Sequence, residues 1–250
     1  MLIEPFSQGT SLLHRCDPRA KICLSLPYAV TAALLSGLPA AACALTASSG
    51  LILLARLPAG LVLKRLALVN LFILFLWLFL PFSAPGQELF NLGPLACTRE
   101  GLVLAGLITL KSNAVILAVM ALLATSSIPD LGHALSRLGL PDKLTFLLLI
   151  SYRYLHVIVE EYGRLTDAAR IRAFKPGTNL HTYRTYGYLL AMVLVNSFDR
   201  ANRVYQAMLL RGFQGRFYSL REFRLAGRDL GVGLGLAAAV CGLIALDLLV

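Results

Sequence analysis

The stretch LALVNLFILFLWLFLPF, residues 66–82, contains no acidic or basic side chain. An α-helix rises about 1.5 Å per residue, so a run of this length comes close to crossing the apolar part of a bilayer. Similar apolar runs occupy 22–36, 39–55, 101–124 and 230–250. Together they predict an all-α, polytopic membrane protein with about five transmembrane helices.

The composition supports a membrane protein. Of the 250 residues, 58% are hydrophobic and 14% are charged, whereas soluble domains carry about 25% charged residues. The net charge of +10 gathers in short segments between the apolar runs, as the positive-inside rule predicts. No nucleic-acid-binding motif accompanies this charge, so we expect no nucleic-acid partner. The first twenty residues lack the pattern of a cleavable signal peptide.

The distribution of Lys and Arg predicts the topology. It places the N-terminus, the loop 56–65 and the region 126–228 in the cytoplasm, and the loop 83–100 outside. The protein is therefore expected to be a multi-pass protein of the inner (plasma) membrane. Three parts are predicted. Residues 1–125 hold four transmembrane helices, 126–228 form a cytoplasmic module of long amphipathic coupling helices, and 229–250 form a last transmembrane helix.

One sequence pattern occurs twice, 39 residues apart. Its first copy is Arg164, Ala168, Arg172, Ala173 and Phe174. Residues four and eight apart lie on one face of a helix. The copy therefore predicts an Arg–Ala–Arg stripe that ends in a small residue and an aromatic residue.

The second copy has the same spacing: Arg203, Ala207, Arg211, Gly212 and Phe213. A small residue beside an arginine allows another surface to approach while the guanidinium reaches into it. The two stripes are consistent with docking of a soluble partner. They are also consistent with basic amphipathic helices that lie on anionic lipid.

Lys111 lies about ten residues into the run 101–124, with Asn113 nearby. A charge inside a membrane span faces protein or water rather than lipid. Two interpretations stay open for Lys111 and Asn113: a structural polar contact inside the bundle, or a role in transport or partner contact.

Motifs of common enzymes are missing. The sequence has no Walker A loop, no H-E-x-x-H pattern and no C-x2-C pair. We therefore expect no enzyme activity, no metal site and no cofactor on this chain. Glu160, Glu161 and Asp167 lie among arginines and are expected to be ion-pair partners rather than general acids.

The chain resembles a known family, the transmembrane T components of energy-coupling factor (ECF) transporters, in particular the cobalt/nickel type called CbiQ. Asp17-Pro18-Arg19-x-Lys21 resembles the family's opening, with a capping acid, a first-turn proline and a basic anchor. The other similar segments are 127–141, 154–174 and 196–215.

The resemblance implies that Arg172 and Arg211, beside Ala173 and Gly212, each dock in an acidic groove of one of two ABC ATPase subunits. Arg170 is an alternative contact. The chain departs from the family's Ala-Arg-Gly or Ala-Arg-Ser pattern, because Ile171 and Leu210 precede the two arginines and Ala173 replaces glycine in the first motif.

The implied function is mechanical. ATP and Mg²⁺ would bind to the partner ATPases, and a membrane substrate-binding (S) subunit would bind cobalt or nickel, a choice that this sequence does not determine. Two alternatives remain: a stand-alone secondary transporter with Lys111 in its pathway, and a membrane-anchored assembly protein whose basic helices bind lipid.

Overall fold

A computed structural model describes residues 6, 9–83, 85, 87–92, 95–214 and 227–249. The chain divides into two compact units. One contains α1–α4, a β-hairpin and α8, and the other contains α6, α7 and α5 from Gly132 onward. In order, the elements are α1 (Pro18–Leu34), α2 (Leu38–Ala55), α3 (Ala59–Ser83), β1 (Glu88–Leu92), β2 (Leu95–Thr98), α4 (Arg99–Leu122), α5 (Ile128–Arg137), α6 (Asp142–Ile171), α7 (Leu180–Leu210) and α8 (Gly227–Leu249).

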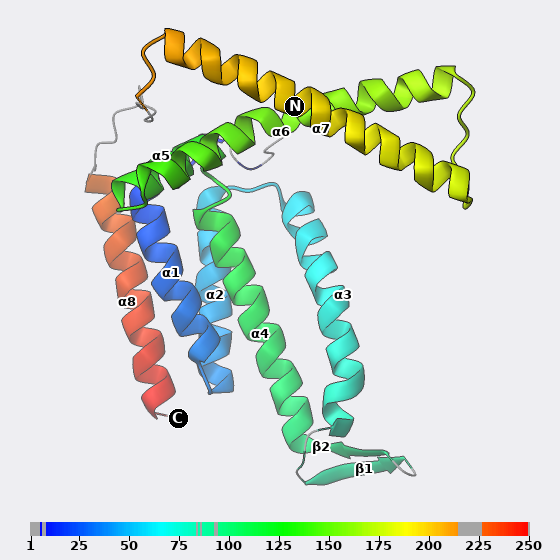
Figure 1. Cartoon of the computed structure of the whole chain (residues 1–250). Helices are drawn as coiled ribbons and strands as arrows, with labels where there is room; N and C mark the ends of the chain where they lie inside the picture. Colours follow the sequence, from blue (N-terminus) through cyan, green and yellow to red (C-terminus); the bar gives the residue numbers. More distant parts are fainter. Residues whose placement is uncertain are drawn as a thin grey trace. The chain divides into compact units, whose positions relative to one another are not determined.

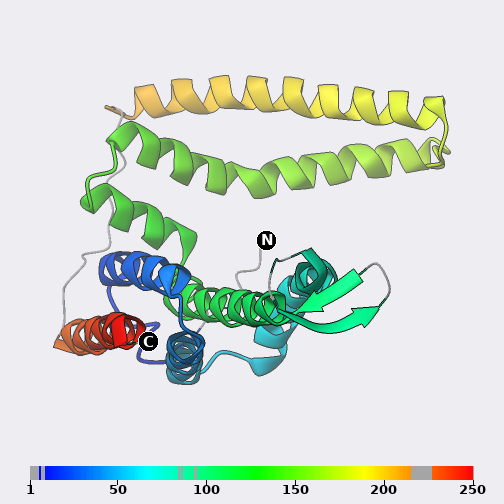
Figure 2. The ribbon, with the colours of Figure 1, turned by 90° about the horizontal axis from the view of Figure 1, so that it is seen from below.

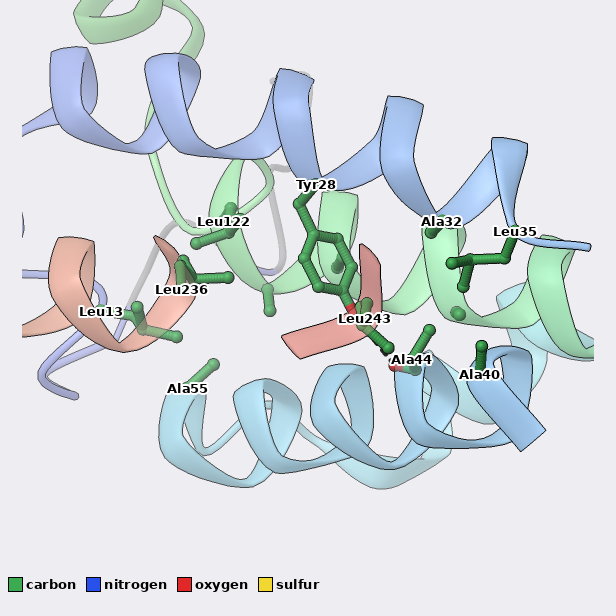
Figure 3. Packing of buried hydrophobic residues seen from close by; sticks show 13 residues of the cluster. Leu13, Tyr28, Ala32, Leu35, Ala40, Ala44, Ala55, Leu122, Leu236 and Leu243 are labelled. Carbon is green, nitrogen blue, oxygen red and sulfur yellow. Dashed lines mark hydrogen bonds between the residues drawn. The ribbon is translucent and has the colours of Figure 1, made fainter. Parts of the chain in front are cut away.

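The first unit is a helical bundle whose core lies between α1, α2, α4 and α8 (Figures 1 and 3). Small side chains dominate this core, including Ala32, Ala40 and Ala44, which are fully buried. They let the helix backbones approach closely, which is how helices gain packing contacts in a membrane. Tyr28 crosses the core, and its hydroxyl donates to the carbonyl of Ala44 at 2.7 Å.

The prediction of an all-α, polytopic membrane protein is confirmed. Among the described residues, four helices are long and apolar enough to cross a membrane: α2, α3, α4 and the 229–248 part of α8. The predicted first span corresponds to α1, which has 17 residues and is roughly 25 Å long at 1.5 Å per residue. It packs into the same core as the longer helices.

One predicted boundary is wrong. Lys64 and Arg65 were expected in a basic loop, but α3 begins at Ala59 and includes both. Lys and Arg are good helix formers, and their long side chains can extend away from an apolar surface. Helix α1 begins at Pro18, four residues before the predicted apolar run 22–36. There the side chain of Asp17 accepts the backbone N–H of Arg19 at 2.9 Å, as the capping pattern predicted.

The predicted outer loop 83–100 contains secondary structure that the sequence analysis did not anticipate. Strands β1 and β2 pair in an antiparallel hairpin, with Asn91 opposite Ala96 and Leu92 opposite Leu95. The hairpin leads directly into α4, where the Thr98 hydroxyl accepts the N–H of Gly101 at the helix start.

The second unit is built on two long helices. Helix α6 has 30 residues and α7 has 31, so each is about 45 Å long. They run in opposite directions and cross each other in Figure 1, and Figure 2 shows them as neighbours seen from below. Helix α7 starts at Asn179, whose side chain accepts the N–H of Thr182 at 2.8 Å. Residues 215–226, which belong to the predicted module 126–228, lie outside the described residues.

Candidate docking ends of α6 and α7

Helix α6 ends in a tight turn that reverses its backbone. Arg172 is the C-cap, and Ala173 follows with φ +64°. The Ala173 N–H donates to the carbonyl of Arg170 at 3.0 Å, and the Phe174 N–H donates to that of Ala169 at 3.1 Å. This pair of hydrogen bonds is a Schellman motif, which satisfies the last carbonyls of a helix.

Helix α7 ends in the same way. Arg211 is the C-cap and Gly212 has φ +76°. The Gly212 N–H donates to the carbonyl of Leu209 at 3.0 Å, and the Phe213 N–H donates to that of Met208 at 3.0 Å. The sequence repeat therefore corresponds to one helix end built twice. The small residue after each arginine occupies a left-handed backbone position, where a Cβ is disfavoured.

The aromatic residue of each end packs on the first turns of the other helix. Phe174 makes an edge contact with Tyr186 of α7, with ring centroids 5.7 Å apart. Phe213 packs against Phe146 of α6 at 5.2 Å. This reciprocal packing fixes both turns, so each arginine projects from an ordered helix end.

The two C-cap arginines are exposed. In the part of the chain that the structure describes, neither Arg172 nor Arg211 has an ion-pair or side-chain hydrogen-bond partner. A cation at a helix C-terminus is favoured by the helix dipole. The preceding residues are also exposed, Ile171 at 87% and Leu210 at 90%. Each end therefore presents a guanidinium beside a solvent-exposed aliphatic side chain.

The other stripe residues lie on the same helices: Arg164 and Ala168 on α6, and Arg203 and Ala207 on α7. All four are exposed. Arg164 donates to Glu161 at 2.6 Å. Since this contact holds Arg164 within α6, its guanidinium is less available than that of Arg172.

Arg170 also has an intrahelical partner, because its guanidinium lies 3.4 Å from the carboxylate of Asp167. The expectation that Glu161 and Asp167 form ion pairs is thus confirmed. Arg170, the alternative docking residue, differs from Arg172 in having this nearby carboxylate.

Glu161 also joins the two long helices. It accepts from the amide of Asn196 at 3.0 Å and from Arg200 at 3.3 Å, both on α7. Beside this contact, a cavity of about 530 Å³ separates α6 from α7. Its lining is mostly apolar and includes Ile150, Tyr154, Ile158, Val204 and Met208. The helices are therefore joined at discrete contacts rather than packed along their whole length.

The intramembrane polar residues contact other helices of the bundle. Lys111 is half-buried, and its Nζ donates to the carbonyl of Ala33 at 3.0 Å. Asn113 and Asn70 of α3 exchange two amide hydrogen bonds, of 3.0 and 3.1 Å. These contacts connect α4 to the end of α1 and to the middle of α3.

Asp247, near the end of α8, holds the other side of this junction. Its carboxylate accepts the N–H groups of Ser36 and Gly37 at 2.7 and 2.9 Å, at the start of α2. Lys111 and Asp247 also interact electrostatically. Both charges thus stabilise one turn, the cation at the end of α1 and the anion at the start of α2, as the helix dipoles favour.

Among the described residues, no group of three or more His, Cys, Asp or Glu side chains is placed to hold a metal ion. The cysteines Cys23, Cys43 and Cys241 are free thiols.

An all-helical, multi-pass bundle with two equivalent exposed helix ends has the features of a transmembrane coupling component. Comparisons with known proteins identify the group. Residues 9–220 match the CbiQ family, described as cobalt transport protein. The chain belongs to this family of ECF-transporter T components, which are non-catalytic transporter subunits.

Similar proteins carry the name energy-coupling factor transporter transmembrane protein EcfT. The one from Acidaminococcus fermentans is 28% identical, over 97% of this chain and 91% of its own length. The one from Heliobacterium modesticaldum is 28% identical, over 89% of this chain and 88% of its own length. The one from Bacillus subtilis is 27% identical, over 86% of this chain and 85% of its own length.

The left-handed turns generate a paired prediction. Replacement Gly212→Ala should weaken the end of α7 by about 1 kcal/mol, because alanine disfavours the left-handed region. No atom lies within 4 Å of the added Cβ, so any loss of stability comes from the backbone conformation and not from a steric clash. Ala173→Gly should strengthen the end of α6 by a similar amount. Amide exchange of Phe213 and Phe174 should change about fivefold, in opposite directions.

Gly187→Ala, inside α7 and equally free of neighbours, is the matched control. It should slow exchange around residue 187, since alanine is a better helix former than glycine. Exchange that slows at Phe213 in Gly212→Ala would contradict the assignment of this turn.

Proposed function

We propose that this chain is the coupling subunit of an ECF importer that takes up cobalt or nickel ions. In this role it transmits ATP-driven motion from two ABC ATPase subunits to a membrane S subunit. The observation that carries the proposal is the pair of equivalent helix ends, each with an exposed arginine that lacks a partner in the described residues. ATP and Mg²⁺ act on the ATPases, and this chain needs no cofactor of its own.

The chemistry of the two ends defines the docking surface. A guanidinium forms two parallel hydrogen bonds with a carboxylate, most strongly where water is excluded. The neighbouring Ile171 and Leu210 are among the most exposed large apolar residues described. A groove with a carboxylate at its edge and an apolar floor would satisfy both side chains at once. Two such ends on one chain fit one ATPase subunit each.

The arrangement of α6 and α7 supports a mechanical role. The helices contact each other through Phe146–Phe213, Glu161–Arg200 and Phe174–Tyr186. The cavity lies between the first two of these contacts. Closure of two ATPases around ATP would draw the docked ends together. A binding event changes conformation only through different contacts with two states. Helices that are joined at separate points can supply two such states by sliding or rotating.

Cobalt or nickel as the transported ion is the finer part of the proposal. It is supported by the family description, cobalt transport protein. A division of labour in which the S subunit holds the ion fits the absence of a metal-ligand cluster among this chain's described residues.

The stand-alone transporter is less well supported. It requires charged groups available to a substrate pathway, whereas Lys111 binds the backbone at the end of α1 and Asp247 binds the backbone at the start of α2.

The central prediction of the proposal concerns Arg172 and Arg211. Either alanine variant should lose ATPase copurification or uncouple hydrolysis from cobalt uptake, and the double variant should abolish uptake. Removing one member of a desolvated charge pair costs about 2–5 kcal/mol of binding, largely because its partner is left unpaired. The measurements are ATPase copurification and uptake of radioactive cobalt or nickel by proteoliposomes that contain the complete complex.

The double variant Arg153→Ala/Arg184→Ala is the matched control. It removes the same charge from exposed positions of the same two helices, where a single charge is worth about 0–1 kcal/mol. If the helices only bind lipid, the two double variants should behave alike. Equal loss of uptake with ATPases still bound in both would refute docking.

We also propose that the N-terminus and the α6–α7 unit are cytoplasmic and that the β-hairpin is external, in a plasma membrane. The supporting observation is the concentration of Lys and Arg in the N-terminal and 126–228 segments.

This topology predicts labelling from opposite sides. In a cysteine-free background, Gln87→Cys next to the hairpin should react with an impermeant thiol reagent in intact cells. Thr178→Cys, in the exposed loop between α6 and α7, should react only after the cells are opened. Reaction of both cysteines in intact cells would contradict the topology.

A further inference from the structure

Charged side chains are deeply buried at one place in the bundle. Among the described residues, the buried charged ones are Lys21, which is 2% exposed, and Asp17 and Asp229, which are each 6% exposed. Asp17 caps α1, Lys21 lies one turn further along, and Asp229 is in the first turn of α8. The Asp17 N–H donates to the carboxylate of Asp229 at 2.9 Å. We call these three residues the buried charge cluster.

Lys21 extends the cluster to a third part of the bundle. Its ammonium donates to the hydroxyls of Thr125 at 3.1 Å and Ser126 at 2.8 Å. Lys21 was expected to be a basic anchor before the first span. That expectation is wrong, because hydroxyl groups more than a hundred residues away hold its charge inside the protein.

The stability of the bundle does not by itself account for this cluster. Desolvation of buried charges offsets much of their attraction, and apolar residues of similar size often stabilise a fold equally well. Charged and hydroxyl groups instead restrict a site to the one arrangement in which each group has its partners. The cluster therefore specifies how α1, α8 and the end of α4 are joined.

The positions of its members along the chain suggest what this joint does. Thr125 and Ser126 lie just before α5, which leads into α6. Asp229 lies at the start of α8, after the segment that follows α7. Both covalent connections between the α6–α7 unit and the bundle therefore reach the bundle at the buried charge cluster, and α1 holds the two together.

We propose that the buried charge cluster is the joint through which movement of α6 and α7 is passed to the transmembrane helices, with Lys21 as its positioning residue. The inference rests on the proposed function. With Lys21 in place, a displacement of either connection moves α1, α4 and α8 together. Without it, the α4–α5 junction can move independently of α1, so ATP is hydrolysed without driving uptake.

The test compares Lys21→Met, which keeps the length of the side chain and removes its charge, with Lys21→Arg. The complete complex is reconstituted in proteoliposomes, and ATPase copurification, ATP hydrolysis and cobalt uptake are measured on one preparation. Lys21→Met should keep the ATPases and hydrolyse ATP within about twofold of wild type. The ions taken up per ATP should fall about tenfold or more, and Lys21→Arg should restore most of this ratio.

Lys64→Met is the matched control, because Lys64 is an exposed lysine of α3 and should leave the ratio unchanged. A milder variant, Thr125→Val/Ser126→Ala, removes only the hydroxyl partners and covers the case in which Lys21→Met fails to assemble. It too should lower the ratio. If an assembled Lys21→Met complex takes up as many ions per ATP as wild type, the inference is overturned but the proposed function is not. If Lys21→Met does not assemble, the same result in the milder variant overturns the inference. Absence of ATPases from the wild-type preparation overturns the proposed function and this inference with it.

Discussion

The way each long helix of the second unit ends is the constraint on which the proposed docking site depends. At residues 173 and 212 the backbone enters the left-handed region, and the following N–H turns back to the helix carbonyls. This turn places two neighbouring side chains in opposite environments. The phenylalanine packs against the other helix, while the arginine stays exposed. A straight continuation of either helix would separate the guanidinium from this ordered support.

The bundle shows how polar groups organise an apolar setting. Its alanine-rich core gives close contact but little selectivity between alternative alignments of the helices. Selectivity comes from a few polar pairs, such as Asn70 with Asn113 and the Tyr28 hydroxyl with Ala44. Inside a membrane such groups have few other partners, so each pair favours one register. Lys111 and Asp247 favour one alignment in the same way, because they bind the end of α1 and the start of α2.

Much of this architecture could be predicted from the sequence. The apolar runs indicated the membrane helices, and the spacing of Arg164, Ala168 and Arg172 indicated an exposed helix face, because both patterns are local. The roles of Lys21 and Asp247 were missed because their partners lie far away in the chain. From its charge alone, Lys21 was expected to lie at the edge of the membrane. The hydroxyls of Thr125 and Ser126 instead allow it to be buried in the protein. The sequence explained the small residue after each arginine only by the room it leaves for a partner. The left-handed backbone at residues 173 and 212 was missed, because a spacing pattern does not reveal a backbone angle.

The most direct measurement of the central claim is the distance between the two proposed docking ends during the ATP cycle. Spin labels at Lys175→Cys and Gln214→Cys lie just beyond the two left-handed turns, at exposed positions. In the complete complex, the account predicts that ATP binding shortens this distance and that release of the nucleotide restores it. An unchanged distance between the nucleotide-free and ATP-bound states, in a complex that hydrolyses ATP and takes up its ion, would contradict transmission through α6 and α7.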